Sequence, residues 1–294
     1  MAFPIGSLRL PFLVLTPVCV LLGVSTAVWS GHEINLFYLG LIMLAAVCAH
    51  ISVNAFNEYF DFRSGLDFKT KRTSFSGGSG TLVEHPELAK QVLGIAILTL
   101  IVTCTIGLHF IYVNGLALLP LGMLGVLLIT LYTSWITHHP ILCLIAAGVG
   151  FGPLMVMGTD LILSGHYSWT AFVVSLVPFL LANNLLLLNQ MPDIEADKVV
   201  GRRHIAIVMG TRFASHLFGI SLLWVYLILC LSVYFDSLPV LVLMAMVTLM
   251  GALPLYLGVV RYANNAERLV PYMGLNVLIT LLMPALMAVG LLLG

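Results

Sequence analysis

The feature that most constrains this chain is a nearly unbroken series of long apolar segments. Of its 294 residues, 61% are hydrophobic and only 8% are charged, whereas a soluble domain carries about 25% charged residues. A helix that crosses a bilayer needs roughly 20 apolar residues. We therefore expect an all-α membrane protein of about nine transmembrane helices, with residues 1–294 forming a single membrane-embedded domain and the lipid bilayer as its solvent.

Apolar runs that end at polar residues, glycine or proline predict the individual spans. No small-residue cleavage pattern follows the first run, so we expect it to be retained as a span. The nine predicted spans are 10–29, 35–57, 89–110, 114–134, 140–163, 169–191, 213–235, 238–260 and 271–293.

Charged residues are distributed very unevenly between the two sides that this count defines. All 12 Lys and Arg residues fall on the side formed by the N-terminus and the loops after spans two, four, six and eight. The positive-inside rule then places these segments in the cytoplasm and the C-terminus outside, as in a bacterial or archaeal inner membrane. The net charge is zero, so the composition indicates no nucleic-acid partner. The five cysteines lie singly in apolar runs, which argues against a metal or disulfide role for them.

Two cytoplasmic loops, at about 58–88 and 192–212, are much longer than the others, and long loops tend to be functional. Each begins with an asparagine followed four residues later by an aspartate, and this spacing puts both side chains on one helix face. Gly65 is expected to bend the chain inside the first motif, and Pro192 to end or kink the helix inside the second. The polar residues of the two motifs are Asn57, Asp61, Asp67, Asn189, Asp193 and Asp197.

Four aspartates at two helix ends would repel one another unless cations lay between them. Mg²⁺ prefers hard oxygen ligands and completes its shell with water and phosphate oxygens, so these six residues are candidate metal ligands. Basic residues follow both motifs and are candidates, with Asn57 and Asn189, for binding an anionic diphosphate. These are Lys69, Arg72, Lys198, Arg202 and Arg203. A single Asp or Asn at a helix end is more often a cap, but two matching motifs on one side favour a shared site.

At these residues the sequence resembles the UbiA superfamily of intramembrane prenyltransferases, and within it the MenA type. The likeness covers nearly the whole chain and is carried by 15–17, 57–67, 77–80, 131–133, 151–154 and 189–203. The sequence departs from the family pattern at three places. Glu58 stands where many members have Asp, Pro192 stands where a basic residue is common, and residues 145–150 lack a Gly-Leu-Gly-Glu segment.

The resemblance implies a helical bundle around a central cavity, with cytoplasmic capping loops and a lateral opening for the prenyl chain. It implies Mg²⁺-dependent transfer of that chain from an isoprenoid diphosphate to an aromatic acceptor, 1,4-dihydroxy-2-naphthoate in menaquinone biosynthesis. Asp61, Asp67, Asp193 and Asp197 would be catalytic through the metal, and Tyr132 would face the cavity and stabilise a carbocation. The segment 77–80 would belong to a mobile cap.

Two alternatives remain open at this point. A prenyltransferase of the same superfamily with another acceptor, such as 4-hydroxybenzoate or another quinone or lipid precursor, would carry the same motifs. An ion-coupled secondary transporter would also have repeated helical units and buried acids, although its acids would lie near the bilayer midplane.

Overall fold

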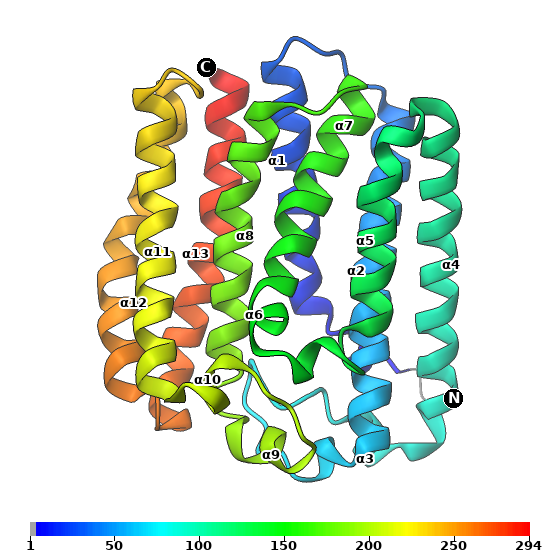
Figure 1. The fold of residues 1–294 in the computed structure, drawn as a ribbon, viewed down its shortest axis with the longest axis vertical. Coiled ribbons are helices and arrows are strands. Elements are labelled where there is room, and N and C mark those ends of the chain that lie inside the picture. The colour runs from blue at the N-terminus through cyan, green and yellow to red at the C-terminus, as the bar shows by residue number, and fades with distance from the viewer. Residues whose placement is uncertain (1–3) are drawn as a thin grey trace.

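A computed structural model describes residues 4–294, and within that range every regular element is a helix. Eight helical segments are long and apolar enough to cross a membrane, and a shorter apolar helix, Leu116–Leu131, lies beside them. The helices run side by side along the long axis of the molecule, and the C-terminus lies at the end opposite the first described residues (Figure 1). The predicted all-α membrane fold is confirmed, with the fourth of the nine predicted spans shorter than expected.

Several spans are built from more than one helix. The N-terminal half contains η1 (Gly6–Leu8), η2 (Leu10–Val14), α1 (Leu15–Trp29), α2 (Leu36–Ser64), η3 (Leu66–Phe68), α3 (Thr81–Glu84), η4 (Pro86–Leu88), α4 (Ala89–Asn114), η5 (Leu116–Leu118) and α5 (Leu119–Leu131). The remainder contains η6 (Ile136–His138), α6 (Pro140–Val149), η7 (Gly150–Met157), α7 (Gly158–Ser164), α8 (Trp169–Asn189), α9 (Ile194–Val199), α10 (Ile205–Val208), α11 (Gly210–Tyr234), η8 (Val240–Thr248), α12 (Leu249–Tyr262) and α13 (Ala266–Leu293).

Small residues allow the central helices to approach closely. A Cβ atom on Gly23 of α1 would lie 2.5 Å from the carbonyl oxygen of Val156, and one on Gly152 would lie 2.5 Å from that of Ser175 in α8. In lipid, where apolar burial does not drive helices together, such close backbone packing replaces it. The helices α1 and α8 therefore pack closely against the segment Gly150–Met157 between them.

The fifth span contains a wide turn. Residues Gly150–Met157 form a π-helix with Pro153 inside it, between α6 and α7. Proline lacks the amide hydrogen that an α-helix needs at that position, and π-turns accommodate such a break. The wider turn places Phe151, Leu154 and Met155 on the wall of a cavity.

The short helices gather at one end of the bundle. Figure 1 shows α3, α9 and α10 together at the end opposite the C-terminus. Helix α2 continues to Ser64, so Asn57 and Asp61 of the first motif lie in a helix and not in a loop as the predicted boundary at residue 57 suggested. Gly65 then ends the helix with a φ of 79°, a left-handed conformation that glycine adopts readily.

Candidate functional site

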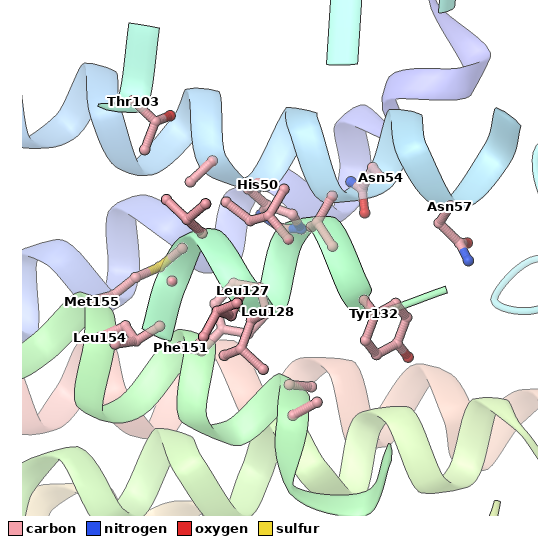
Figure 2. A pocket seen from close by; sticks show the side chains of 18 of the residues that line it. His50, Asn54, Asn57, Thr103, Leu127, Leu128, Tyr132, Phe151, Leu154 and Met155 are labelled. Carbon is pink, nitrogen blue, oxygen red and sulfur yellow. The ribbon is translucent and has the colours of Figure 1, made fainter. Parts of the chain in front are cut away.

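A cavity of about 850 Å³ runs between α2, α4, α5 and the α6–η7–α7 segment. Its volume is within the usual range of ligand sites. The close-up view shows Asn57 and Tyr132 near one end, His50 and Phe151 in the middle, and Thr103 near the other end (Figure 2). Polar side chains gather at the end capped by the short helices, and the rest of the wall is mainly apolar.

The first motif contributes three polar side chains to this cavity. Asn57, Asp61 and Asp67 all line it, and Asp61 and Asp67 are 5% and 4% exposed. The turn at Gly65 brings Asp67, which lies in the short helix η3, back to the side of α2 that carries Asp61. The expectation that Gly65 lets these carboxyl groups face one site is confirmed by their common cavity.

The second motif contributes three more. Helix α8 ends at Asn189, the chain turns through Pro192, and Asp193 stands at the N-cap position of α9. Asn189, Asp193 and Asp197 line the same cavity as the first motif. The break predicted from Pro192 is confirmed, and it frees the Asp193 carboxylate, which makes no capping bond to its own helix.

One arginine connects the two motifs. Arg202 donates a hydrogen bond to Asp61 and another, of 3.0 Å, to Asp197 Oδ1. The side chains of Asp61, Asp197 and Arg202 are 7%, 3% and 14% exposed, so this ion pair is largely desolvated. The other oxygen of Asp197 lies 3.1 Å from His204 Nε2, which fixes the orientation of this carboxylate.

A glycine-rich loop closes over the carboxylates. Gly77 N donates to Asp193 Oδ2 at 3.1 Å, and Ser79 donates from its backbone and its hydroxyl to Glu58. A side chain on Gly78 would collide with Asp67, whose Oδ1 lies 2.7 Å from the ideal Cβ position. The loop thus contacts acids of both motifs and covers the polar end of the cavity, while Glu58 anchors the cap and is absent from the cavity wall.

Three buried oxygen atoms of the motifs have no hydrogen-bond partner, namely Asp67 Oδ2, Asn189 Oδ1 and Asp193 Oδ1. Burial, together with the nearby Asp61 and Glu58 carboxylates, raises the pKa of Asp67 to about 7. Burial and the Asp197 carboxylate raise the pKa of Asp193 to about 7. Buried carboxyl and amide oxygens without a hydrogen-bond partner are candidate ligands for a cation.

The oxygen atoms of the two motifs fit a Mg²⁺ ion that is only partly coordinated by protein. Within residues 4–294 no three His, Cys, Asp or Glu side chains already enclose a metal position, because Arg202 occupies the space between Asp61 and Asp197. Mg²⁺ typically takes one or two carboxylates and completes its shell with water and phosphate oxygens. The free oxygens of Asp67, Asn189 and Asp193 match this mode of binding.

Most of the basic residues predicted to contact a diphosphate lie elsewhere. Lys198 pairs with Glu195 at the surface, and the Arg72 side chain packs over Gly80 and pairs with Glu84. Lys69 and Arg203 are exposed and, like the other two, are absent from the cavity wall. The structure does not bring these four side chains to the cavity wall, because adjacency to a motif in sequence does not set the direction of a long side chain. Of the predicted cations, only Arg202 lines the cavity.

Tyr132 lines the cavity at its polar end, as expected. Burial raises the pKa of the Tyr132 phenol, so the ring stays neutral at physiological pH. Thr133 accepts a hydrogen bond of 3.2 Å from Asn57 Nδ2 and so connects the end of α5 to the first motif. Tyr132 is thereby held beside the carboxylates, where an aromatic face attracts cations.

Comparison with known proteins identifies the family and the fold. The sequence profile of the UbiA prenyltransferase family matches residues 16–289. This chain belongs to the UbiA prenyltransferase family. The solved structures of UbiA homologues have the same fold: one from Aeropyrum pernix superposes with a TM-score of 0.70 at 15% identity, covering 95% of this chain and 98% of the other. A homologue from Archaeoglobus fulgidus bound to DMAPP and Mg²⁺ gives 0.51 at 16% identity, over 94% and 98%.

Relatives within the UbiA family include proteins of two named kinds. The 1,4-dihydroxy-2-naphthoate octaprenyltransferase of Bacillus subtilis is 29% identical over 216 residues, which are 71% of this chain and 67% of the relative. The UbiA prenyltransferase domain-containing protein 1 of Xenopus tropicalis is 30% identical over 220 residues, 71% of this chain and 60% of the relative. This chain therefore spans about two thirds or less of the lengths of these relatives.

The structure adds site residues of this UbiA-family chain that the sequence reasoning missed. Arg9 lines the cavity, donates to Asn57 Oδ1 at 3.3 Å, and has a buried Nε with no partner. It is the only basic residue before Arg63, which was the available signal. His50 also lines the cavity, bonded to Thr16 at 2.7 Å and packed edge-on against Phe151. No spacing rule singled out His50, because a lone histidine in an apolar helix is usually a core residue.

Proposed function

We propose that this chain transfers a prenyl group from an isoprenoid diphosphate to an aromatic acceptor, with residues 1–294 acting as a single catalytic domain that depends on Mg²⁺. The observation that carries the proposal is the meeting of both aspartate motifs and Arg202 at one end of a long, otherwise apolar cavity. Such a cavity suits a substrate with a highly charged head and a hydrocarbon tail. The diphosphate-bound and Mg²⁺-bound homologue supports this assignment.

Metal binding in this proposal uses the oxygens that lack partners. Asp67, Asn189 and Asp193 would hold Mg²⁺ directly, and Asn57, Asp61 and Asp197 would complete the polar shell. When bound, the metal supplies Lewis-acid stabilisation of the diphosphate as the allylic C–O bond breaks. Asp61 and Asp197 also keep Arg202 in place, so that its guanidinium is directed at the same end of the cavity.

Two guanidinium groups would bind the diphosphate directly. Arg202 and Arg9 both line the cavity, and the unpaired Nε–H of Arg9 is a free donor there. Arginine matches the geometry of phosphate oxygens with two parallel hydrogen bonds. Because these groups are fixed by Asp61, Asp197 and Asn57 before the substrate arrives, they stabilise the leaving group without reorganisation.

The remaining residues protect and direct the carbocation. The loop at Gly77–Gly80 covers the polar end, so bulk water that would convert the cation to an alcohol is excluded. The neutral ring of Tyr132 lies at the same end and stabilises positive charge through its face. The electron-rich ring of the acceptor then forms the new C–C bond to the prenyl cation. A simple aromatic acceptor loses the ring proton, and 1,4-dihydroxy-2-naphthoate loses its carboxylate as CO₂.

For the acceptor we propose 1,4-dihydroxy-2-naphthoate, in menaquinone biosynthesis, on the strength of the relatives in Bacillus subtilis and Escherichia coli that carry this name. The carboxylate of this acceptor requires a cation. Arg63, Arg203 and Arg212 are exposed and away from the cavity, and within residues 4–294 the arginines that line it are Arg9 and Arg202. We further propose that the end formed by α3, α9 and α10 faces the cytoplasm.

The test is to incubate the purified protein in vesicles with Mg²⁺, labelled geranyl diphosphate and a panel of aromatic acids. Prenylated naphthoate is expected, and EDTA should abolish its formation. Transfer only to 4-hydroxybenzoate or another acceptor would disprove the naphthoate assignment and leave the prenyltransferase assignment standing. Neither transfer nor diphosphate release would disprove the enzyme and favour the transporter alternative.

A further inference from the structure

Four polar side chains of α2 line the cavity and lie on one face of the helix. These are His50, Asn54, Asn57 and Asp61, and their spacing along the chain matches the period of a helix. Asn57 lies near the end with the aspartate motifs, whereas His50 lies in the middle of the cavity (Figure 2). A rise of about 1.5 Å per residue places His50 about 10 Å from Asn57 and about 16 Å from Asp61 along the helix axis.

The prenyl donor does not account for a polar group at the depth of His50. An isoprenoid diphosphate has polar atoms only at its head, which the proposed function places at the end with both motifs. Its tail is hydrocarbon and forms no hydrogen bonds. A polar side chain in a mainly apolar wall is costly unless it finds a partner, so His50 calls for a ligand with a polar group of its own.

Two contacts fix the orientation of the His50 ring. Its Nδ1 lies 2.7 Å from the hydroxyl of Thr16, a fully buried residue of α1. Its ring packs edge-on against Phe151 of η7, with ring centroids 5.0 Å apart. Within residues 4–294 the other ring nitrogen, Nε2, has no hydrogen-bond partner, and the side chain lines the cavity with 7% of its surface accessible. Nε2 is therefore the atom that a ligand in the cavity can reach.

A hydroxylated aromatic acid has polar groups at the required separation. Arg9, bonded to Asn57 at 3.3 Å, is available to its carboxylate, since a guanidinium has five N–H donors. In 1,4-dihydroxy-2-naphthoate the carboxylate and the 4-hydroxyl are about 6 Å apart, and a hydrogen bond at each end adds about 3 Å. The sum of about 12 Å is close to the separation of Asn57 and His50. A hydroxyl both donates and accepts, so it can bond to either tautomer of the imidazole.

We propose that His50 is a specificity-determining residue that binds, through Nε2, the acceptor hydroxyl farther from the carboxylate. Thr16 is then a positioning residue that holds the imidazole in place. This inference rests on the proposed function and adds to it how the second hydroxyl of the acceptor is recognised.

The experiment compares 1,4-dihydroxy-2-naphthoate with 1-hydroxy-2-naphthoate, which lacks the 4-hydroxyl, under anaerobic conditions in vesicles with Mg²⁺ and geranyl diphosphate. The measured quantity is the ratio of kcat/KM for the two acceptors, because this ratio does not depend on the amount of folded protein. Leaving a buried polar group without its hydrogen bond costs about 1–3 kcal/mol, which corresponds to a factor of about 5 to 150. His50→Phe should lower the preference for the dihydroxy acceptor by that factor relative to wild type.

The control is His109→Phe, the same substitution at an exposed position of α4 outside the cavity lining, and it should leave the preference within about twofold of wild type. Thr16→Val should lose an intermediate part of the preference, because the ring is then held less firmly. His50→Gln, whose amide group can reach the position of Nε2, should keep more of the preference than His50→Phe. The reverse order of these two variants would contradict a hydrogen bond at Nε2.

Equilibrium dialysis of the two acceptors without donor gives a readout that needs no turnover. The 4-hydroxyl should strengthen binding to wild type more than to His50→Phe. An unchanged preference in His50→Phe, or an equal fall with both acceptors, would overturn the proposal, since the residue would then serve only the fold. Binding that depends on His50 in this way, without any transfer, would refute the proposed function and support the binding site. A wild-type protein that neither binds nor prenylates either acceptor would refute both.

Discussion

Replacing Arg202 with methionine should destabilise the metal-free protein strongly, and Mg²⁺ should reverse much of the effect. Methionine keeps the approximate length of the side chain but removes the cation that bridges Asp61 and Asp197. Breaking a buried ion pair by removing one partner costs about 3–5 kcal/mol. For a domain of this approximate size, each kcal/mol lowers Tm by about 2–4 °C, so the expected loss is about 6–20 °C.

The assay is thermal unfolding in detergent, with EDTA and with saturating Mg²⁺. Arg203→Met is the matched control, because Arg203 is adjacent in sequence, exposed, and outside the ion pairs formed within residues 4–294. In EDTA we expect Arg202→Met to unfold well below both wild type and control. Added Mg²⁺ should raise its Tm more than that of wild type, since the metal would then neutralise two additional carboxylates. Equal Tm values for the two variants in EDTA would refute the electrostatic account of the site.

The same geometry gives four further expectations. Asp193→Ala should abolish turnover and leave the protein folded, as judged by its elution in size-exclusion chromatography; an active variant would disprove its role as a metal ligand. The pKa values of Asp67 and Asp193, raised from 3.8 to about 7, mean that the metal-free protein should be more stable at pH 6 than at pH 8, because this contribution is lost as pH rises through the folded pKa. Conversely, the Mg²⁺ concentration for half-maximal activity should increase as pH falls below about 7, since metal and protons compete for these oxygens, and a constant value would contradict this. With Cys230 replaced by serine, single cysteines can be introduced at exposed positions at the two ends of the bundle: Ser64 and Val199 at the end with the motifs, and Glu33 and Asp236 at the other end. An impermeant thiol reagent should label the first pair from one side of the membrane and the second pair from the opposite side. Labelling of the Ser64 and Val199 positions from different sides would disprove the shared site.

The sequence alone determined the fold class and most of the membrane-crossing segments. Hydrocarbon cannot satisfy backbone polar groups, so runs of about 20 apolar residues must be helical, and the uneven placement of the basic residues defined which loops share a side. The two Asn-Asp spacings, Gly65 and Pro192 were also local signals. Each acts through backbone geometry that neighbours in sequence set, and the structure places each motif at the same end of the bundle.

Only the tertiary structure decided which charges meet. Arg202 and Arg203 are adjacent in sequence, yet one side chain lies between Asp61 and Asp197 and the other is exposed. Arg9 is far from either motif in sequence. It reaches Asn57 because α1 begins at the side of the bundle where α2 ends. The direction of a long side chain and the contact of His50 with Thr16 depend on how helices pack against each other. Sequence spacing describes one helix at a time, and packing between helices is decided by contacts across the whole chain.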